Sequence, residues 1–163
     1  MPVNPSVIEQ AGRTFASVLI PLQAELLLIL LLLVSIQDIL ERRISNCLQL
    51  AIAGLTFLQF APINLLGILS ALPYLLVALF SKRSDSIGGG DVKLAGSIGL
   101  VLGLPAGLTA SLIGLTAFVL YGFSVQRHRR YKEKPVKISF PLGPFLATGA
   151  AVAYFIKIGG MFL

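Results

Sequence analysis

Residues 24–43 of the chain read AELLLILLLLVSIQDILERR, an almost unbroken apolar run that ends in charged residues. The rest of the sequence has the same character: 56% of its 163 residues are hydrophobic, 12% are charged, and the mean hydropathy is +0.89. These values lie far from those of a soluble domain of this size. The sequence therefore predicts a protein that is embedded in a lipid bilayer.

Further apolar stretches follow the first one, separated by polar residues, glycine or proline. The first span covers residues 24–36 and extends upstream as far as Ser17, and the others cover residues 47–60, 63–80, 92–104, 108–123 and 140–156. Pro73 is expected to kink the third span. The fourth span would be about 20 Å long as a helix, against roughly 30 Å of hydrocarbon, so we expect it to begin below the membrane surface. The predicted fold is an all-α, polytopic membrane protein of about six transmembrane helices, in a single membrane-embedded domain over residues 1–163.

The basic residues are distributed unevenly between the two sides of the predicted membrane. One side carries Arg42, Arg43, Lys82, Arg83, Lys93, Arg127, Arg129, Arg130, Lys132, Lys134 and Lys137. The other side carries only Arg13 and Lys157. Short loops rich in Lys and Arg remain in the cytoplasm, so the first side is predicted to be cytoplasmic. Both termini then face outward from the inner (plasma) membrane, and the first span is interpreted as a retained helix rather than a cleavable signal.

The formal net charge of +6 would suggest a nucleic-acid partner in a soluble protein, but here the basic residues set the topology. We therefore predict no nucleic-acid partner, and we expect the basic loop at residues 126–137 to contact anionic membrane lipid. The single cysteine, Cys47, and the single histidine, His128, are too few to build a zinc site. The sequence accordingly predicts neither a metal site nor a cofactor.

Two aspartates, Asp38 and Asp91, lie at the ends of predicted spans. The chain crosses the membrane twice between them, so both carboxylates are expected at the cytoplasmic face, where they can meet. Two carboxylates that lie close together cannot both be ionised cheaply, so such a pair shares a proton. The ionised member can act as general base on a water molecule while the protonated member polarises a peptide carbonyl. The pattern predicts peptide hydrolysis with Asp38 and Asp91 as the catalytic residues.

Gly88, Gly89 and Gly90 directly precede Asp91. Glycine adopts backbone angles that are closed to other residues, and it allows another chain to approach closely. An extended substrate could pair with the backbone of these three glycines. The glycine run therefore favours a peptide as the substrate.

Each aspartate also has an ordinary structural interpretation. Asp38 could pair with Arg42 one helical turn later, and Asp91 could stabilise the N-terminus of the fourth helix. Lys93 could tune the carboxylates electrostatically or simply mark the cytoplasmic side. Glu25 is about 20 Å from Asp38 along a helix and is expected at the outer interface. The shared sidedness of the two aspartates favours the catalytic interpretation.

The stretch Ser86-Ile87-Gly88-Gly89-Gly90-Asp91-Val92-Lys93-Leu94 resembles the GxGD motif of type IV prepilin peptidases and archaeal preflagellin peptidases. Asp38 followed by Ile44-Ser45-Asn46 is similar to the aspartate and the Ile-Pro-Asn turn of that family. Residues 141–146, PLGPFL, resemble its Pro-x-Gly-Pro segment, so that the resemblance covers residues 30–155. It implies a GxGD aspartyl protease fold with Asp38 and Asp91 as catalytic residues. The supporting motif residues are then Gly88, Gly89, Gly90, Lys93 and Asn46.

The resemblance also implies a substrate, namely a prepilin or pseudopilin with a basic leader and a hydrophobic helix, cleaved at the cytoplasmic face. It implies the pilus assembly machinery as a further partner. The chain is similar to the small, protease-only branch that serves tight-adherence or Flp pili, so we predict no N-terminal methyltransferase domain and no methyltransferase activity. Ser45 stands where the family usually has proline, and we expect this difference to loosen the turn after the first helix.

Two other functions are compatible with the same residues. A small ion- or proton-coupled transporter or channel subunit would use Asp38 and Asp91 to bind a cation at broken helices. An inactive, structural member of a pilus assembly complex would need neither carboxylate for chemistry. The sequence favours a membrane aspartic endopeptidase over both alternatives.

Overall fold

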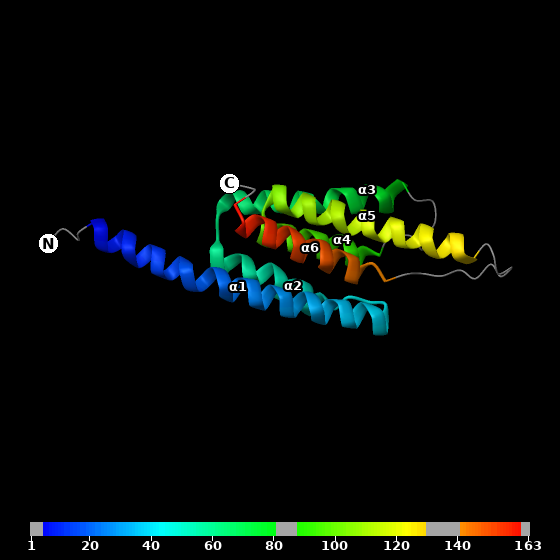
Figure 1. Ribbon diagram of the computed structural model, residues 1–163, viewed down its shortest axis with the longest axis horizontal. Coiled ribbons are helices and arrows are strands. Elements are labelled where there is room, and N and C mark those ends of the chain that lie inside the picture. The colour runs from blue at the N-terminus through cyan, green and yellow to red at the C-terminus, as the bar shows by residue number, and fades with distance from the viewer. Residues whose placement is uncertain (1–4, 81–87, 130–140, 161–163) are drawn as a thin grey trace.

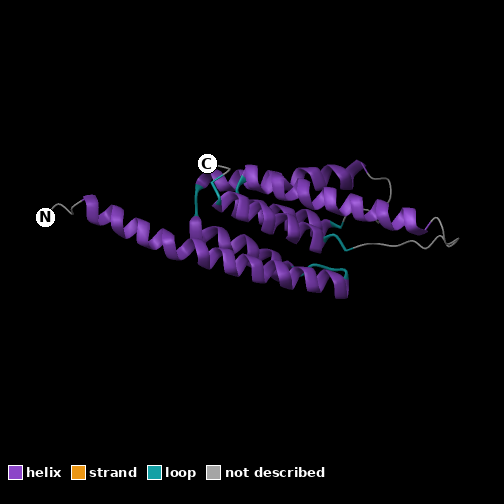
Figure 2. Ribbon diagram, in the orientation of Figure 1, coloured by secondary structure: helices purple, strands orange, loops and turns teal. Residues whose placement is uncertain are grey.

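The computed structural model describes residues 5–80, 88–129 and 141–160, and within these ranges the regular structure is entirely helical (Figure 2). The helices lie roughly side by side in an elongated bundle, and the N-terminal half of the first helix projects beyond it (Figure 1). The all-α fold class predicted from the sequence is therefore confirmed. Several predicted basic positions, Lys82, Arg83 and those at 130–137, lie outside the described residues, as do Ser86 and Ile87 of the glycine motif.

Six helical segments follow one another along the described chain. The first is α1 (Pro5–Glu41). The second joins α2 (Asn46–Gly54) to the 3₁₀ helix η1 (Leu55–Gln59), and the third joins the 3₁₀ helix η2 (Pro62–Ala71) to α3 (Leu72–Phe80). The last three are α4 (Gly89–Leu102), α5 (Leu104–Arg129) and α6 (Gly143–Ile158). Each predicted span overlaps one of these segments, in the predicted order.

Two segments differ in detail from the prediction. Helix α1 is 37 residues long and ends at Glu41, so Asp38 lies inside its last turn. The third segment is not one kinked α-helix, because it is a 3₁₀ helix up to Ala71 and becomes an α-helix directly before Pro73. Proline fits the first turn of a helix, where its missing N–H leaves no hydrogen bond unmade. Pro73 therefore opens α3 rather than kinking a longer helix.

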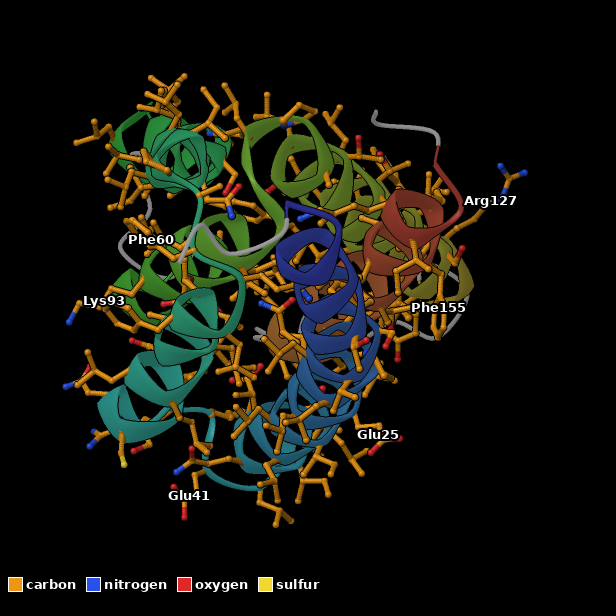
Figure 3. The ribbon with its side chains drawn as sticks, turned by 90° about the vertical axis from the view of Figure 1, so that its left-hand side faces the viewer. Glu25, Glu41, Phe60, Lys93, Arg127 and Phe155 are labelled. Carbon is orange, nitrogen blue, oxygen red and sulfur yellow. The ribbon has the colours of Figure 1, made fainter. Side chains whose placement is uncertain are left out.

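Among the described residues, three helices are long and apolar enough to cross a membrane: Ser17–Glu41, Pro62–Leu79 and Leu104–Val125. The apolar helices Asn46–Gln59 and Gly143–Ile158 are shorter, and α4 has only 14 residues. Large apolar side chains such as Leu32, Phe123 and Phe155 are exposed, and Phe155 lies on the outside of the bundle in Figure 3. An outward apolar surface of this kind is stable in lipid rather than in water, as expected for a membrane-integral protein.

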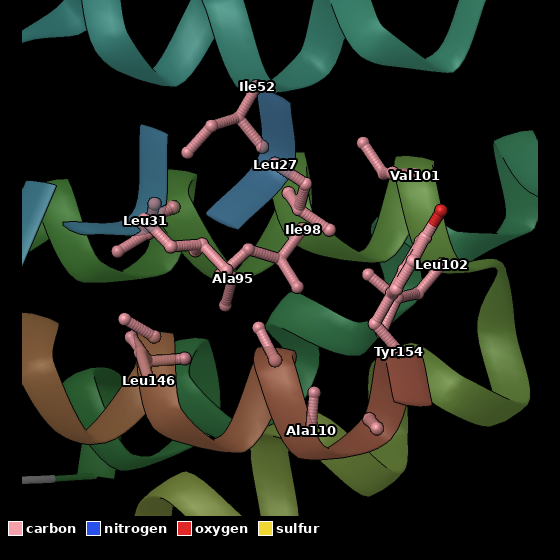
Figure 4. Close-up of a cluster of buried hydrophobic side chains, with 14 of the residues drawn as sticks. Leu27, Leu31, Ile52, Ala95, Ile98, Val101, Leu102, Ala110, Leu146 and Tyr154 are labelled. Carbon is pink, nitrogen blue, oxygen red and sulfur yellow. The ribbon is translucent and has the colours of Figure 1, made fainter. Parts of the chain in front are cut away.

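Helix α4 runs through the middle of the bundle and is buried from Leu94 to Gly99. Its Ala95 and Ile98 belong to one hydrophobic cluster with Leu27 and Leu31 of α1 (Figure 4). Burial on all sides explains why α4 carries no charged residue from Leu94 onward. The first residues of α4 are therefore positioned by neighbours that surround the whole helix.

Glycines allow α4 to approach η2 very closely. A Cβ atom on Gly99 would collide with the carbonyl oxygen of Gly67 and with the hydroxyl of Ser70. The Ser70 hydroxyl donates a hydrogen bond to the carbonyl oxygen of Ala95 at 3.0 Å, which satisfies it inside the bundle. The backbones of α4 and η2 are therefore in direct contact at Gly99 and Gly67.

The two ends of the bundle differ in charge. Helices α2, α4 and α6 begin at the end where α1 terminates, on the right in Figure 1. The described basic residues at that end are Arg42, Arg43, Lys93 and Arg127, whereas Lys157 lies near the opposite end, in the last turn of α6. The described residues therefore keep the asymmetry that the sequence predicted.

Candidate active site

Asp38 lies on the face of α1 that points into the bundle. Leu27, Leu31 and Val34 are buried on that face at helical spacings of four and three residues, and Asp38 follows four residues after Val34. The exposed fraction of Asp38 is only 6%, although α1 ends at Glu41. The helical spacing therefore places the Asp38 carboxylate inside the bundle, at the end where α1 terminates.

The N-terminus of α6 holds the carboxylate of Asp38. The backbone amide of Gly143 donates a hydrogen bond to Asp38 Oδ2 at 2.7 Å. Gly143 is the first residue of α6, so its N–H is one that the helix leaves without an acceptor. A Cβ atom on Gly143 would lie 2.8 Å from Asp38 Oδ2 and 2.9 Å from Asp38 Cβ, which leaves no room for a side chain. This contact explains the glycine of the PLGPFL segment.

The ordinary interpretation of Asp38 as a partner of Arg42 does not describe its carboxylate. The backbone amide of Arg42 donates to the Asp38 carbonyl oxygen at 3.0 Å, as the helix ends, and Arg42 itself adopts a φ of 53°. The side chain of Arg42 is exposed, whereas the carboxylate of Asp38 accepts from Gly143 inside the bundle. The two residues are therefore joined through the backbone.

Asp91 is the third residue of α4 and is half-buried. Its Oδ2 atom accepts a hydrogen bond from the backbone amide of Gly88 at 3.1 Å, and its own amide donates to the Gly88 carbonyl oxygen at 3.0 Å. These contacts are typical of an acid that caps a helix N-terminus. The structural interpretation of Asp91 thus accounts for one of its two carboxylate oxygens.

The structure brings the two predicted catalytic aspartates together. Asp38 comes from the last turn of α1 and Asp91 from the first turn of α4, and the charge of Asp38 is near enough to act on the Asp91 carboxyl group. Both residues therefore lie at the end of the bundle where α1 terminates and α4 begins. Within the described ranges, the His, Cys, Asp and Glu side chains form no group of three or more that could hold a metal ion.

The glycines before Asp91 do not use backbone angles that only glycine adopts. Gly88 has φ −74° and ψ 149°, an extended conformation open to other residues, and Gly89 and Gly90 already belong to α4. The described glycines with positive φ lie elsewhere in the chain. Helix α4 therefore begins two residues before Asp91. The run does leave space, since a Cβ atom on Gly89 would have no neighbour within 4 Å.

A sequence model of the type IV leader peptidase family matches residues 26–123, a range that contains both aspartates. The chain belongs to this family. The prepilin leader peptidase/N-methyltransferase of Bacillus subtilis (strain 168) is 30% identical over 163 aligned positions, which cover 93% of this chain and 62% of that relative. The chain thus spans less than two thirds of the length of this relative. No solved structure matches the chain.

Two residues that the resemblance predicts to support the site, Lys93 and Asn46, contact each other. Lys93 Nζ donates to Asn46 Oδ1 at 3.5 Å, and both side chains are exposed. Lys93 points away from the bundle in Figure 3. Its described contact therefore joins the first turns of α2 and α4 at the surface.

Ser45, at the position where the resemblance implies a proline, makes two hydrogen bonds in the turn between α1 and α2. Its hydroxyl accepts a hydrogen bond from the Cys47 amide at 3.2 Å and so caps α2. Its own amide donates to Gln37 Oε1 at 3.0 Å, a bond that proline cannot make because it has no N–H. Its φ of −63° would suit proline equally well. Ser45 therefore holds this turn through two hydrogen bonds, where proline would act through its rigid ring.

Two glutamines at this site were not predicted from the sequence. Gln37, next to Asp38, accepts from the Ser45 amide, and Gln49 of α2 donates to the carbonyl oxygen of Gly90 at 3.0 Å. Gln49 is a polar residue within the apolar second stretch, which is a signal that could have identified it. Nothing in the sequence indicates which backbone group such a side chain reaches.

The bond between Asp38 and Gly143 can be tested through stability. Asp38→Asn retains an acceptor for the Gly143 amide, and we expect it to unfold at nearly the same temperature as the wild type in detergent. Asp38→Leu, which is similar in size, leaves that buried amide without an acceptor and is expected to lose about 1–3 kcal/mol of unfolding free energy. Equal stability of the two variants would contradict the described bond.

Proposed function

We propose that this chain is a membrane aspartic endopeptidase that removes the leader peptide from prepilins or pseudopilins at the cytoplasmic face of the inner (plasma) membrane. The observation that carries the proposal is the meeting of Asp38 and Asp91 at one end of an apolar bundle, in a member of the type IV leader peptidase family. The name of the Bacillus subtilis relative supports a prepilin as the substrate. Neither the family nor the relative supports the transporter alternative.

The proposed chemistry follows from a pair of acids that holds one proton. The ionised carboxylate takes a proton from a water molecule, which attacks the scissile carbonyl carbon. The protonated carboxyl group donates a hydrogen bond to the carbonyl oxygen and then delivers its proton to the leaving amine. The amides of Gly143 and Gly88 hold one oxygen of each acid, so both side chains are oriented before the substrate arrives.

The proposed orientation places the aspartate end of the bundle in the cytoplasm and both termini outside. Arg42, Arg43, Lys93 and Arg127 at this end support it, because short loops rich in basic residues remain cytoplasmic. A prepilin would then present its basic leader at the membrane surface and its hydrophobic helix to the bilayer. Membrane lipid around the outward apolar side chains and the pilus assembly machinery complete the proposed partners.

Loss of leader cleavage in aspartate variants tests the proposal. Purified protein is mixed with a prepilin in detergent, and removal of the leader is followed as a gel shift. We expect Asp38→Asn and Asp91→Asn each to lower the rate by roughly 10²- to 10⁴-fold, since each removes one half of an acid–base pair.

Glu25→Gln provides the matched control for these variants, because Glu25 is an exposed acid of the same chain (Figure 3). It should cleave at the wild-type rate. Leader removal that persists in both aspartate variants would exclude the aspartic mechanism, and a wild-type protein that leaves several different prepilins intact would exclude the proposed substrate class.

The orientation can be tested with the single native cysteine. Cys47 is exposed in the first turn of α2, at the aspartate end. We expect a membrane-impermeant maleimide to label it in inverted vesicles and to leave it unlabelled in sealed, right-side-out vesicles. In a Cys47→Ser, Gly159→Cys variant the pattern should reverse, because Gly159 is exposed just after the end of α6. Labelling of Cys47 from the outside would contradict the orientation.

A further inference from the structure

Helix α2 carries a buried side chain that reaches the backbone next to Asp91. Gln49 has an exposed fraction of only 4% and lies on the inward face of α2 together with Ile52. Its Nε2 atom donates to the carbonyl oxygen of Gly90 at 3.0 Å. A buried amide group costs free energy unless it is hydrogen-bonded, so this bond holds both groups in place.

The acceptor of this bond lies one peptide unit before the candidate catalytic residue. Gly90 belongs to the first turn of α4, and a Cβ atom at its position would lie 3.7 Å from both Gln49 Nε2 and Ile44 Cβ. The first turn of α4 therefore rests directly against Gln49 and Ile44. Any movement of α2 relative to α4 would be transmitted to Asp91 through this contact.

Helix α2 is also linked to the residue next to Asp38. The amide of Ser45 donates to Gln37 Oε1, and the Ser45 hydroxyl caps α2. Gln37 directly precedes Asp38 in the last turn of α1. A continuous path of hydrogen bonds and helix thus leads from the neighbour of Asp38 through α2 to the neighbour of Asp91. The bond between Lys93 and Asn46 strengthens it at the surface.

We propose that Gln49 is a positioning residue that holds the Gly90 carbonyl against α2 and so sets the separation of Asp38 and Asp91. This separation determines whether the two carboxyl groups can share a proton. This inference rests on the proposed peptidase function. Gln49 contacts neither carboxylate in the described hydrogen bonds, so it acts through the backbone of α4.

The role predicts a specific kinetic signature for Gln49→Met, which keeps the volume and removes the donor. Small misplacements of catalytic groups are costly, so kcat for leader removal should fall by roughly 10- to 100-fold with KM nearly unchanged. The profile of kcat against pH should also change shape, because its two limbs depend on the coupling between the carboxylates. If Gln49 only stabilised the fold, its replacement would lower the unfolding temperature without changing this pH profile.

Gln49→Glu adds a test that depends on a single proton. A protonated glutamic acid can donate to the Gly90 carbonyl oxygen, whereas its carboxylate cannot. The rate of Gln49→Glu relative to wild type should therefore rise as the pH falls, and the rate of Gln49→Met relative to wild type should not show this recovery. If Gln49→Met fails to fold, the pH dependence of Gln49→Glu decides alone, and a flat ratio overturns the proposal.

Gln59→Met is the matched control. Gln59 is a glutamine in η1, at the opposite end of the bundle, and its buried Nε2 atom has no hydrogen-bond partner among the described residues. This variant should keep the wild-type kcat and pH profile. An active wild type with an unchanged Gln49→Met overturns the positioning role alone, whereas an inactive wild type overturns the peptidase function and this inference with it.

Discussion

An ionisable side chain inside an apolar bundle is stable only where hydrogen-bond donors or water reach it, and this constraint decides where both aspartates lie. The unpaired amides at a helix N-terminus are such donors. Asp38 accepts from the first residue of α6, and Asp91 accepts from the residue that caps α4. Because α4 and α6 begin at the same end of the bundle, satisfying each acid separately also brings them together (Figure 1).

The packing of α4 fixes the position of its first turn at this end of the bundle. Gly67 and Gly99 let η2 and α4 touch through their backbones, and the apolar cluster around Ile98 surrounds α4 from other sides (Figure 4). The first turn of α4 is then fixed by Gln49, whose own helix is tied to α1 through Ser45. Candidate catalytic groups are thus carried by packed helices rather than by loops, which favours precise orientation.

The sequence predicted those features that follow from hydropathy, charge and periodicity. The order of the helical segments and the basic end of the bundle both belong to this class. The inward direction of Asp38 could also have been predicted, because Leu27, Leu31 and Val34 define the buried face of α1 at helical spacing. Such patterns depend only on local period and composition, and for that reason they can be read without knowing the tertiary contacts.

Other features depend on contacts between residues far apart in the chain. Local sequence patterns do not predict such contacts. The bond from Gly143 to Asp38 joins positions 105 residues apart, and the bond from Gln49 to Gly90 joins positions 41 residues apart. The start of α4 at Gly89 and the change from 3₁₀ to α-helix before Pro73 were also not predicted, because helix ends are poorly fixed by local sequence.

The central claim is that Asp38 and Asp91 form one coupled pair, and carboxyl titration tests it most directly. The chain contains three aspartates, Asp38, Asp85 and Asp91, so protein labelled with ¹³C-aspartate in lipid nanodiscs gives a simple spectrum that Asp38→Asn and Asp91→Asn can assign. The pair should lose its two protons in two well-separated steps, and removing either carboxylate should leave the other with a single step. Two signals that titrate together over one pH range, each unchanged when the other aspartate is replaced, would contradict the account.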